Sequence, residues 1–125
     1  MPQKRILIVE DNTDLRRMFK TALSLAGFIV DEAGDGLEAL RVVEERRPDL
    51  VVLDLMLRAL DGLSVQQELA ASTATAMIPI VIVTGSTIDT DNLDVACVLR
   101  KPVMPDELVR TVRECLKSGA AAGTL

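Results

Sequence analysis

The stretch that most constrains the fold of this chain runs from Asp49 to Met56 and reads DLVVLDLM. Its centre is a run of four apolar residues, which is typical of a strand buried on both faces of a parallel sheet. Asp54 follows this run directly. Because open α/β sheets bind their ligands at the carboxyl ends of the strands, Asp54 is a candidate site residue. An Asp that only caps the next turn is the commoner case, so Asp54 alone does not decide the matter.

Strand and helix patterns alternate along the rest of the chain. Further strands are predicted at residues 5–9, 28–33, 78–83 and 96–99. Helices are predicted after residue 13, after residue 36, over residues 63–70 and from Pro105 onward. Such alternation predicts a parallel sheet with helices on both faces and right-handed crossovers. We expect one domain over residues 1–125, with a core at about 4–117 and a frayed tail at 118–125.

Residue types at the expected helix ends give more local predictions. Thr13 or Asp14 can cap the first helix, and Gly27 can end it. In the second helix, Leu37, Leu40 and Val43 recur at helical spacing and predict an apolar face.

Composition excludes several classes of function. The net charge is −5 with no basic cluster, and Phe19 and Phe28 are the only aromatic residues, which argues against binding of nucleic acid. The absence of histidine excludes histidine general-base catalysis and disfavours a zinc site. Cys97 and Cys115 lie in apolar patterns typical of core residues. No secretory signal or membrane-spanning stretch is visible in the sequence, so we expect a cytoplasmic protein without membrane contact.

Polar residues at the ends of the predicted strands form one constellation. They are Glu10, Asp11, Asp54, Thr84 and Lys101. Because parallel strands end at one edge, three carboxylates should converge there, and their repulsion favours a hard divalent cation such as Mg²⁺. A cation, a hydroxyl and an ammonium are also what a phosphoryl group requires. The carboxylate of Asp54 is then the candidate nucleophile, because a carboxylate can form an acyl phosphate.

These motifs, in this order, resemble the receiver (response regulator) domain of two-component signalling from about Lys4 to Lys117. The matching segments are Ile8-Val9-Glu10-Asp11-Asn12, Leu53-Asp54-Leu55-Met56, Asp61-Gly62, Thr84-Gly85 and Lys101-Pro102. The resemblance implies a flavodoxin-like, doubly wound fold with a parallel five-stranded sheet. It implies a phosphoacceptor signalling domain and not an enzyme in the usual sense.

The resemblance also implies a role for each matching residue. Asp54 accepts the phosphoryl group of a phosphohistidine on a histidine kinase or a phosphotransfer protein, and the domain then switches a protein–protein interaction. Asp11 binds Mg²⁺ directly, Glu10 does so through water, and the carbonyl of Met56 is a further ligand. Thr84 and the amide of Gly85 contact the phosphoryl oxygens. Lys101 pairs with them, and a cis bond is expected before Pro102.

The sequence departs from the family pattern at three places. Arg58 stands where the family often has proline, and we interpret it as a solvated loop charge rather than a phosphate contact. Val98 replaces the usual Tyr or Phe. The interval from Thr84 to Lys101 is short, which predicts a short or absent fourth helix. A switch that uses an aromatic ring is therefore in doubt, and residues 85–94 become the candidate switch segment.

Other functions fit the residues less well. A binding module that keeps the fold without being phosphorylated remains the main alternative. An aspartyl phosphatase would need a general acid two residues after the nucleophile, where Met56 stands. A flavin site is disfavoured because no aromatic residue is available for stacking. The residues leave open whether the chain acts alone or is part of a larger regulator or hybrid kinase, and which protein lies downstream.

Overall fold

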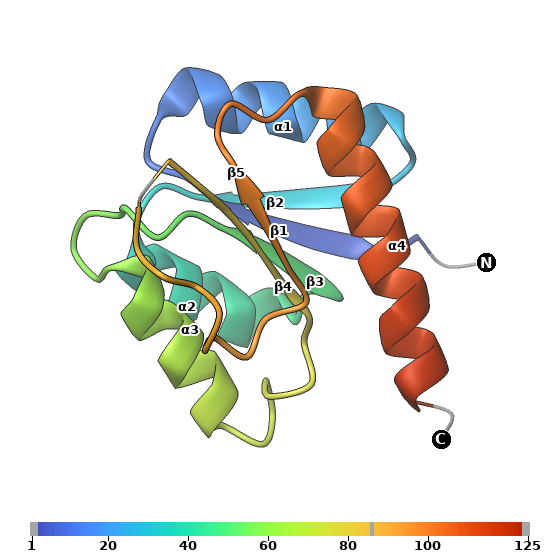
Figure 1. The fold of residues 1–125 in the computed structure, drawn as a ribbon. Coiled ribbons are helices and arrows are strands. Elements are labelled where there is room, and N and C mark those ends of the chain that lie inside the picture. The colour runs from blue at the N-terminus through green and yellow to red at the C-terminus, as the bar shows by residue number, and fades with distance from the viewer. Residues whose placement is uncertain (1–2, 86, 124–125) are drawn as a thin grey trace.

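The computed structural model describes the backbone of residues 3–85 and 87–123 and the side chains of these residues as far as Ser118. Within this range the chain forms one parallel five-stranded sheet in the order β2-β1-β3-β4-β5 (Figure 1). The elements are β1 (Arg5–Val9), α1 (Thr13–Leu25), β2 (Ile29–Ala33), α2 (Gly36–Arg46), β3 (Leu50–Leu53), α3 (Gly62–Ala71), β4 (Ile80–Thr84), β5 (Cys97–Arg100) and α4 (Pro105–Gly123). The predicted doubly wound α/β fold is confirmed.

Alternation along the strands divides the apolar side chains between two cores. On one face, Ile6, Ile8 and Val52 pack under α1 and α4; on the other, Leu7, Val9 and Leu53 pack under α2 and α3. Figure 1 shows these two helix pairs on opposite sides of the sheet. Because both faces are covered, the central strands are continuous apolar runs, as the stretch before Asp54 predicted.

The register of the sheet brings the strand ends to one edge. Val9 is paired with Ala33 on one side and with Leu53 on the other, and Leu53 is paired with Ile82. Thr84 at the end of β4 is paired with Arg100 at the end of β5. Residues that directly follow these positions therefore lie side by side at the carboxyl edge of the sheet.

Helix α1 begins and ends with well-defined caps. The Asn12 side chain accepts a hydrogen bond from the Leu15 amide, so Asn12 is the N-cap and the prediction of Thr13 or Asp14 is wrong by one or two residues. At the other end, Gly27 has φ +100°, and the amides of Gly27 and Phe28 donate to the carbonyls of Ser24 and Leu23. This pair of bonds is the Schellman motif, so Gly27 ends the helix as predicted.

Two further predictions need correction. Leu37 is 59% exposed, because the buried face of α2 is formed by Ala39, Val42 and Val43 instead. Helix α4 extends to Gly123, into the tail that the sequence predicts to be frayed; residues 124–125 lie outside the described part. Strand ends differ from the predictions by one or two residues, and β4 begins at Ile80 because Pro79 cannot donate to the ladder.

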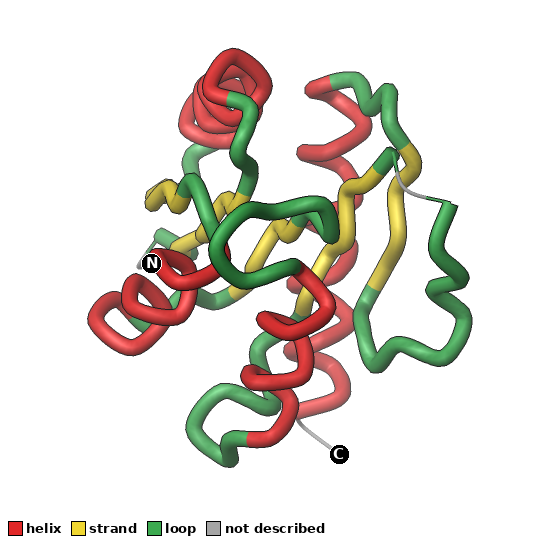
Figure 2. Tube along the Cα trace, turned by 90° about the vertical axis from the view of Figure 1, so that its left-hand side faces the viewer, coloured by secondary structure: helices red, strands yellow, loops and turns green. Residues whose placement is uncertain are grey.

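The connection between β4 and β5 contains no helix among its described residues, which confirms the expected loss of the fourth helix. Figure 2 shows this connection as a long loop that joins the two strands. It is nevertheless anchored. Leu93 packs on the core, and the Arg100 guanidinium donates to the Ile88 carbonyl at 3.1 Å and the Thr90 hydroxyl at 3.3 Å. These contacts hold the middle and the end of the connection in place.

Candidate functional site

The backbone ladder fixes the two buried carboxylates of the predicted constellation. The Glu10 amide donates to the Ala33 carbonyl, and the Asp54 amide donates to the Val9 carbonyl, each at 3.1 Å. Each residue thus extends its strand by one position at the carboxyl edge. The side chains of Glu10 and Asp54 are only 3% and 4% exposed, so both carboxylates are largely removed from water.

One ammonium joins these two carboxylates. Lys101 Nζ lies 2.7 Å from Glu10 Oε1 and 2.8 Å from Asp54 Oδ2. The backbone of Lys101 is held by its amide, which donates to the Thr84 carbonyl at 3.0 Å. The Lys101–Pro102 bond is cis, as expected from the resemblance. Glu10, Asp54 and Lys101 of the constellation predicted from strand ends therefore form a contact network around one ammonium.

Burial and charge act against each other in this network. Desolvation raises the pKa of Glu10 above its ordinary value, and the Asp54 charge adds to this; the hydrogen bonds from Lys101 and the Asn12 amide do not fully offset them. Burial alone would lower the pKa of Lys101, but its hydrogen bonds to Asp54 and Glu10 prevail and the pKa is raised. The ammonium is thus firmly charged, and the carboxylate of Glu10 lacks full compensation.

Asp11 adds a third carboxylate at the mouth of the site. One oxygen from each of Glu10, Asp11 and Asp54 lies within 4.8 Å of the others. Oxygens bound at about 2.0–2.6 Å from one hard cation can lie up to roughly twice that distance apart. These all-oxygen donors therefore fit a hard divalent cation, and its charge would balance the carboxylates that Lys101 leaves uncompensated.

The loop after Asp54 is held by hydrogen bonds from the N-termini of α2 and α3. The Met56 amide donates to Asp54 Oδ1 at 3.0 Å, which orients the carboxylate. The Gly62 amide donates to the Leu55 carbonyl at 3.1 Å, and the Gly36 amide donates to the Arg58 carbonyl at 3.3 Å. A β-carbon at either glycine would overlap backbone atoms of this loop. The pair Asp61-Gly62, one of the segments that match the family, is thus the N-cap and first residue of α3 and supports the site directly.

Sequence reasoning missed one residue that shapes the site. Arg16 donates to the Glu10 carbonyl at 2.8 Å and pairs with Glu32 at 3.2 Å. The sequence feature that could have identified Arg16 is its position in the first turn of α1, where a long side chain points back toward the helix N-terminus.

The remaining predicted residues lie at the same edge of the sheet. Thr84 is fully buried at the end of β4. A β-carbon on Gly85 would lie 3.9 Å from Lys101 Cβ, so Gly85 borders the lysine. Arg58 has a side chain that is 79% exposed, and its Nε lies 3.9 Å from Asp11 Oδ2. The Met56 side chain is 60% exposed, so only its backbone faces Asp54.

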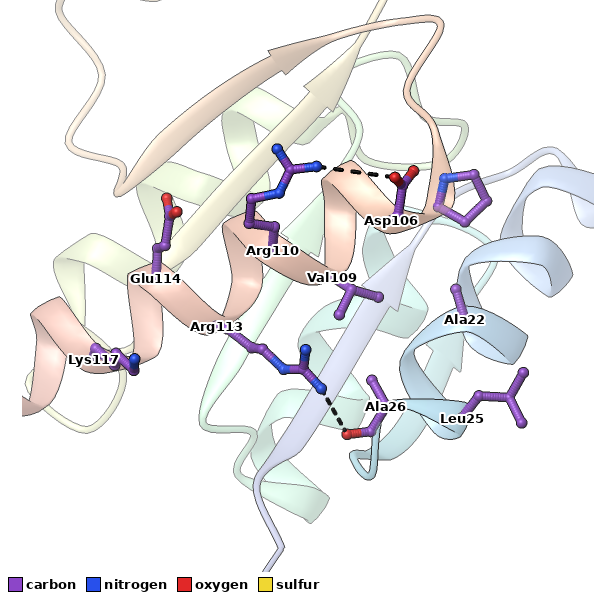
Figure 3. Close-up of a pocket in the computed structure, with 10 residues that line it drawn as sticks. Ala22, Leu25, Ala26, Asp106, Val109, Arg110, Arg113, Glu114 and Lys117 are labelled. Atoms are coloured by element: carbon purple, nitrogen blue, oxygen red, sulfur yellow. Dashed lines mark hydrogen bonds and ion pairs between the residues drawn. The ribbon is translucent and has the colours of Figure 1, made fainter.

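A hollow of about 700 Å³ lies elsewhere, between α1 and α4 (Figure 3). Its walls include Leu25, Val109 and Arg113, and Figure 3 shows Arg113 reaching the Ala26 carbonyl at the end of α1. It shares no residue with the acidic cluster. The donor atoms, rather than the depth of a cavity, therefore mark the candidate site.

A sequence profile of the response regulator receiver domain family matches residues 6–113. The chain is 40% identical over 123 residues to the DNA-binding response regulator MtrA of Mycolicibacterium paratuberculosis, covering 92% of this chain and 52% of that protein. It is 36% identical over 122 residues to a probable transcriptional regulator, ycf27, of Porphyridium aerugineum, covering 94% and 50%. The chain thus spans about half the length of these curated relatives.

Solved structures agree with this match. A CheY-like receiver domain protein of Methanospirillum hungatei JF-1 superposes with a TM-score of 0.90 at 25% identity, covering 97% of this chain and 99% of that one. The receiver domain of sensor histidine kinase PA1611 from Pseudomonas aeruginosa PAO1, described with a magnesium ion coordinated in its active site cleft, gives 0.84 at 28% identity, covering 93% and 99%.

The chain belongs to the response regulator receiver domain family of two-component signal transduction. Receiver domains are signalling phosphoacceptor modules rather than conventional enzymes. Among the residues that the structure describes, no helix combines the length and apolar character needed to cross a membrane.

Proposed function

We propose that this chain is a phosphoacceptor receiver domain and that Asp54 takes a phosphoryl group from a phosphohistidine. The observation that carries the proposal is the bridge from Lys101 to both Glu10 and Asp54, which holds a charged ammonium against the candidate nucleophile. A structural ion pair would not require the third carboxylate, Asp11, at the same place.

In the proposed step, a carboxylate oxygen of Asp54 attacks the phosphorus of the donor. An O–P bond forms while the N–P bond to the donor imidazole breaks, and the electron pair of that bond returns to the imidazole. Lys101, already hydrogen-bonded to Asp54 Oδ2, is positioned to neutralise the transferred phosphoryl oxygens. The Thr84 hydroxyl and the Gly85 amide are proposed to contact the same oxygens.

We propose Mg²⁺ as the cation that Glu10, Asp11 and Asp54 would hold, with the Met56 carbonyl as a further ligand. The magnesium described in the Pseudomonas aeruginosa receiver supports this choice. When bound, such an ion would supply positive charge that stabilises the phosphoryl oxygens during transfer.

The proposed donor is a histidine kinase or a phosphotransfer protein in the cytoplasm, and the output is a changed protein–protein interaction. Family membership supports this assignment. The DNA-binding activity named for MtrA belongs to a protein that this chain covers by half, so it is not carried over to this chain.

The experiment is incubation with acetyl phosphate and Mg²⁺, followed by measurement of the intact mass. We expect the mass of a single phosphate to be gained, and we expect no gain when EDTA replaces Mg²⁺ or when Asp54 is changed to Asn. Asp35→Asn serves as the control, because Asp35 caps α2 and is not part of the acidic cluster. A domain that keeps the fold as a binding module only would gain no phosphate under any of these conditions.

A further inference from the structure

Arg58 is a cation at the mouth of the acidic site whose backbone is held by hydrogen bonds and whose side chain is largely exposed. Its carbonyl accepts hydrogen bonds from the Gly36 amide at 3.3 Å and the Leu60 amide at 2.8 Å. The next residue, Ala59, has φ +67°, so the loop makes a tight turn here. The side chain, in contrast, is 79% exposed. The loop therefore holds the base of a long, exposed cation beside the site.

The guanidinium of Arg58 approaches only the outermost carboxylate. Its Nε lies 3.9 Å from Asp11 Oδ2. The two inner carboxylates, Glu10 and Asp54, form ion pairs with Lys101 instead. Asp11 is 30% exposed at its side chain, so water screens this contact. Exposed pairs of this kind contribute about 0.2–1 kcal/mol, which makes the contact easy to exchange for another.

A divalent cation and the Arg58 guanidinium compete for the same carboxylate. A cation held by Asp11 removes the attraction that keeps Arg58 there, and an exposed arginine then finds another anion within reach of its side chain. The nearest anion during the proposed reaction is the phosphoryl donor that approaches Asp54. Arginine suits this role because its planar guanidinium can donate two parallel hydrogen bonds to phosphate oxygens.

We propose that Arg58 is an exchanging cation: it pairs with Asp11 when no metal is bound, is displaced by the metal, and then binds the anionic phosphoryl donor. This inference rests on the proposed phosphoacceptor function and adds a donor-binding residue to it. It replaces our interpretation of Arg58, made from the sequence, as a solvated loop charge without a role.

The test compares Arg58→Ala and Arg58→Lys with a matched control, Arg110→Ala. Arg110 is also an exposed arginine, 66% exposed at its side chain, and lies 4.0 Å from a single carboxylate, Asp106, on α4. Its replacement changes the net charge of the chain by the same amount and breaks a pair of the same kind, but on a helix that carries none of the acidic cluster.

The first measurement is the Mg²⁺ dissociation constant, taken from melting temperatures over a Mg²⁺ titration without any phosphodonor. We expect Arg58→Ala to bind Mg²⁺ roughly 1.4- to fivefold more tightly, which is the energy of an exposed pair expressed as an affinity. Arg58→Lys and Arg110→Ala should stay close to the wild type. This measurement does not depend on phosphorylation, so it stands even if the proposed function fails.

The second measurement is the rate of phosphorylation by acetyl phosphate at saturating Mg²⁺. We expect Arg58→Ala to raise the KM for acetyl phosphate, the concentration that gives half of the maximal single-turnover rate constant, several-fold. The maximal rate constant itself should change little, and Arg58→Lys should restore most of the loss. Higher ionic strength should narrow the difference between wild type and Arg58→Ala. The proposal is overturned if Arg58→Ala matches Arg110→Ala in either its Mg²⁺ affinity or its KM. Failure of every protein, wild type included, to gain phosphate would instead reject the proposed function.

Discussion

Lys101 Nζ donates to Asp54 Oδ2 across 2.8 Å, although 47 residues separate the two in the sequence. Both side chains reach this contact from the carboxyl edge of the sheet, Asp54 from the end of β3 and Lys101 from the end of β5. The contact joins residues that the alternation of strands and helices brings together, and it is the centre of the candidate site.

The first prediction concerns removal of this cation. Lys101→Met should lower the free energy of unfolding by about 3–5 kcal/mol at neutral pH in EDTA, because Glu10 and Asp54 would stay buried without a partner. Urea denaturation measures this change. Lys20→Met is the matched control: Lys20 pairs with Glu32 at 3.2 Å but is 47% exposed, so its loss should cost less than about 1 kcal/mol. Equal losses in the two variants would contradict a buried bridge.

The second prediction concerns the pH dependence of stability. Desolvation is the main cause that raises the pKa of Glu10 above 4.5 in the folded protein. A raised carboxyl pKa means that the folded state holds the proton more tightly than the unfolded chain does. The resulting stability is fully present below pH 4.5 and is lost as the pH rises through the folded pKa.

Glu10→Gln removes this titration. The free energy of unfolding of the wild type, measured in EDTA relative to Glu10→Gln, should therefore fall as the pH is raised from about 4 to 7. Denaturation curves at several pH values check this. A difference that stays constant, or that grows in favour of the wild type, would contradict a desolvated Glu10.

The third prediction concerns the metal. Saturating Mg²⁺ should raise the melting temperature at neutral pH, since a ligand at 100 times its Kd adds about 2.7 kcal/mol to the stability of the folded state. Asp11→Ala should lose most of this rise, whereas Asp106→Ala, in the exposed first turn of α4 and outside the acidic cluster, should keep it. Thermal unfolding followed by circular dichroism measures both. An equal response in Asp11→Ala and Asp106→Ala would argue against the proposed ligand set.

The fourth prediction concerns residues 85–94. Phosphoryl oxygens that attract Thr84 and the Gly85 amide should draw the start of this segment toward the site, and the bonds from Arg100 to Ile88 and Thr90 should hold its middle. We therefore expect a hinge in which amide protection rises near residue 85 and changes less at Thr90. Hydrogen exchange with and without beryllofluoride and Mg²⁺ decides this. Unchanged protection over 85–94, with a response on another face, would show that the output surface lies there.

Much of the fold and the site could be predicted because both follow from the ends of buried strands. The apolar runs before Glu10, Asp54 and Thr84 are visible in the sequence, and parallel strands must end at one edge. Lys101 belonged to the same pattern, since it follows β5 directly. Continuous apolar runs and the positions of the strand ends were enough to place all four.

Individual hydrogen bonds of side chains to the backbone could not be predicted in this way. The choice of Asn12 over Thr13 as the cap depends on a single hydrogen bond to Leu15, and neighbouring polar residues look alike in a sequence. The bond from Arg16 to the Glu10 carbonyl depends on the exact rotation of α1.

The contacts of Arg100 show the same limit. They depend on the path of a loop with no periodic pattern. Leu37 fits the helical spacing but lies just outside the buried face of α2. A small rotation of the helix about its axis decides whether such a residue is buried or exposed.

The central claim is that one carboxylate, Asp54, carries the phosphoryl group. The most direct measurement is reduction of the acetyl phosphate-treated protein with borohydride, which converts an aspartyl phosphate to homoserine, followed by peptide mapping. We expect homoserine at position 54 alone, formed only when Mg²⁺ is present. Homoserine at Asp11 or at another acidic residue, or none in a protein that has gained phosphate, would contradict it.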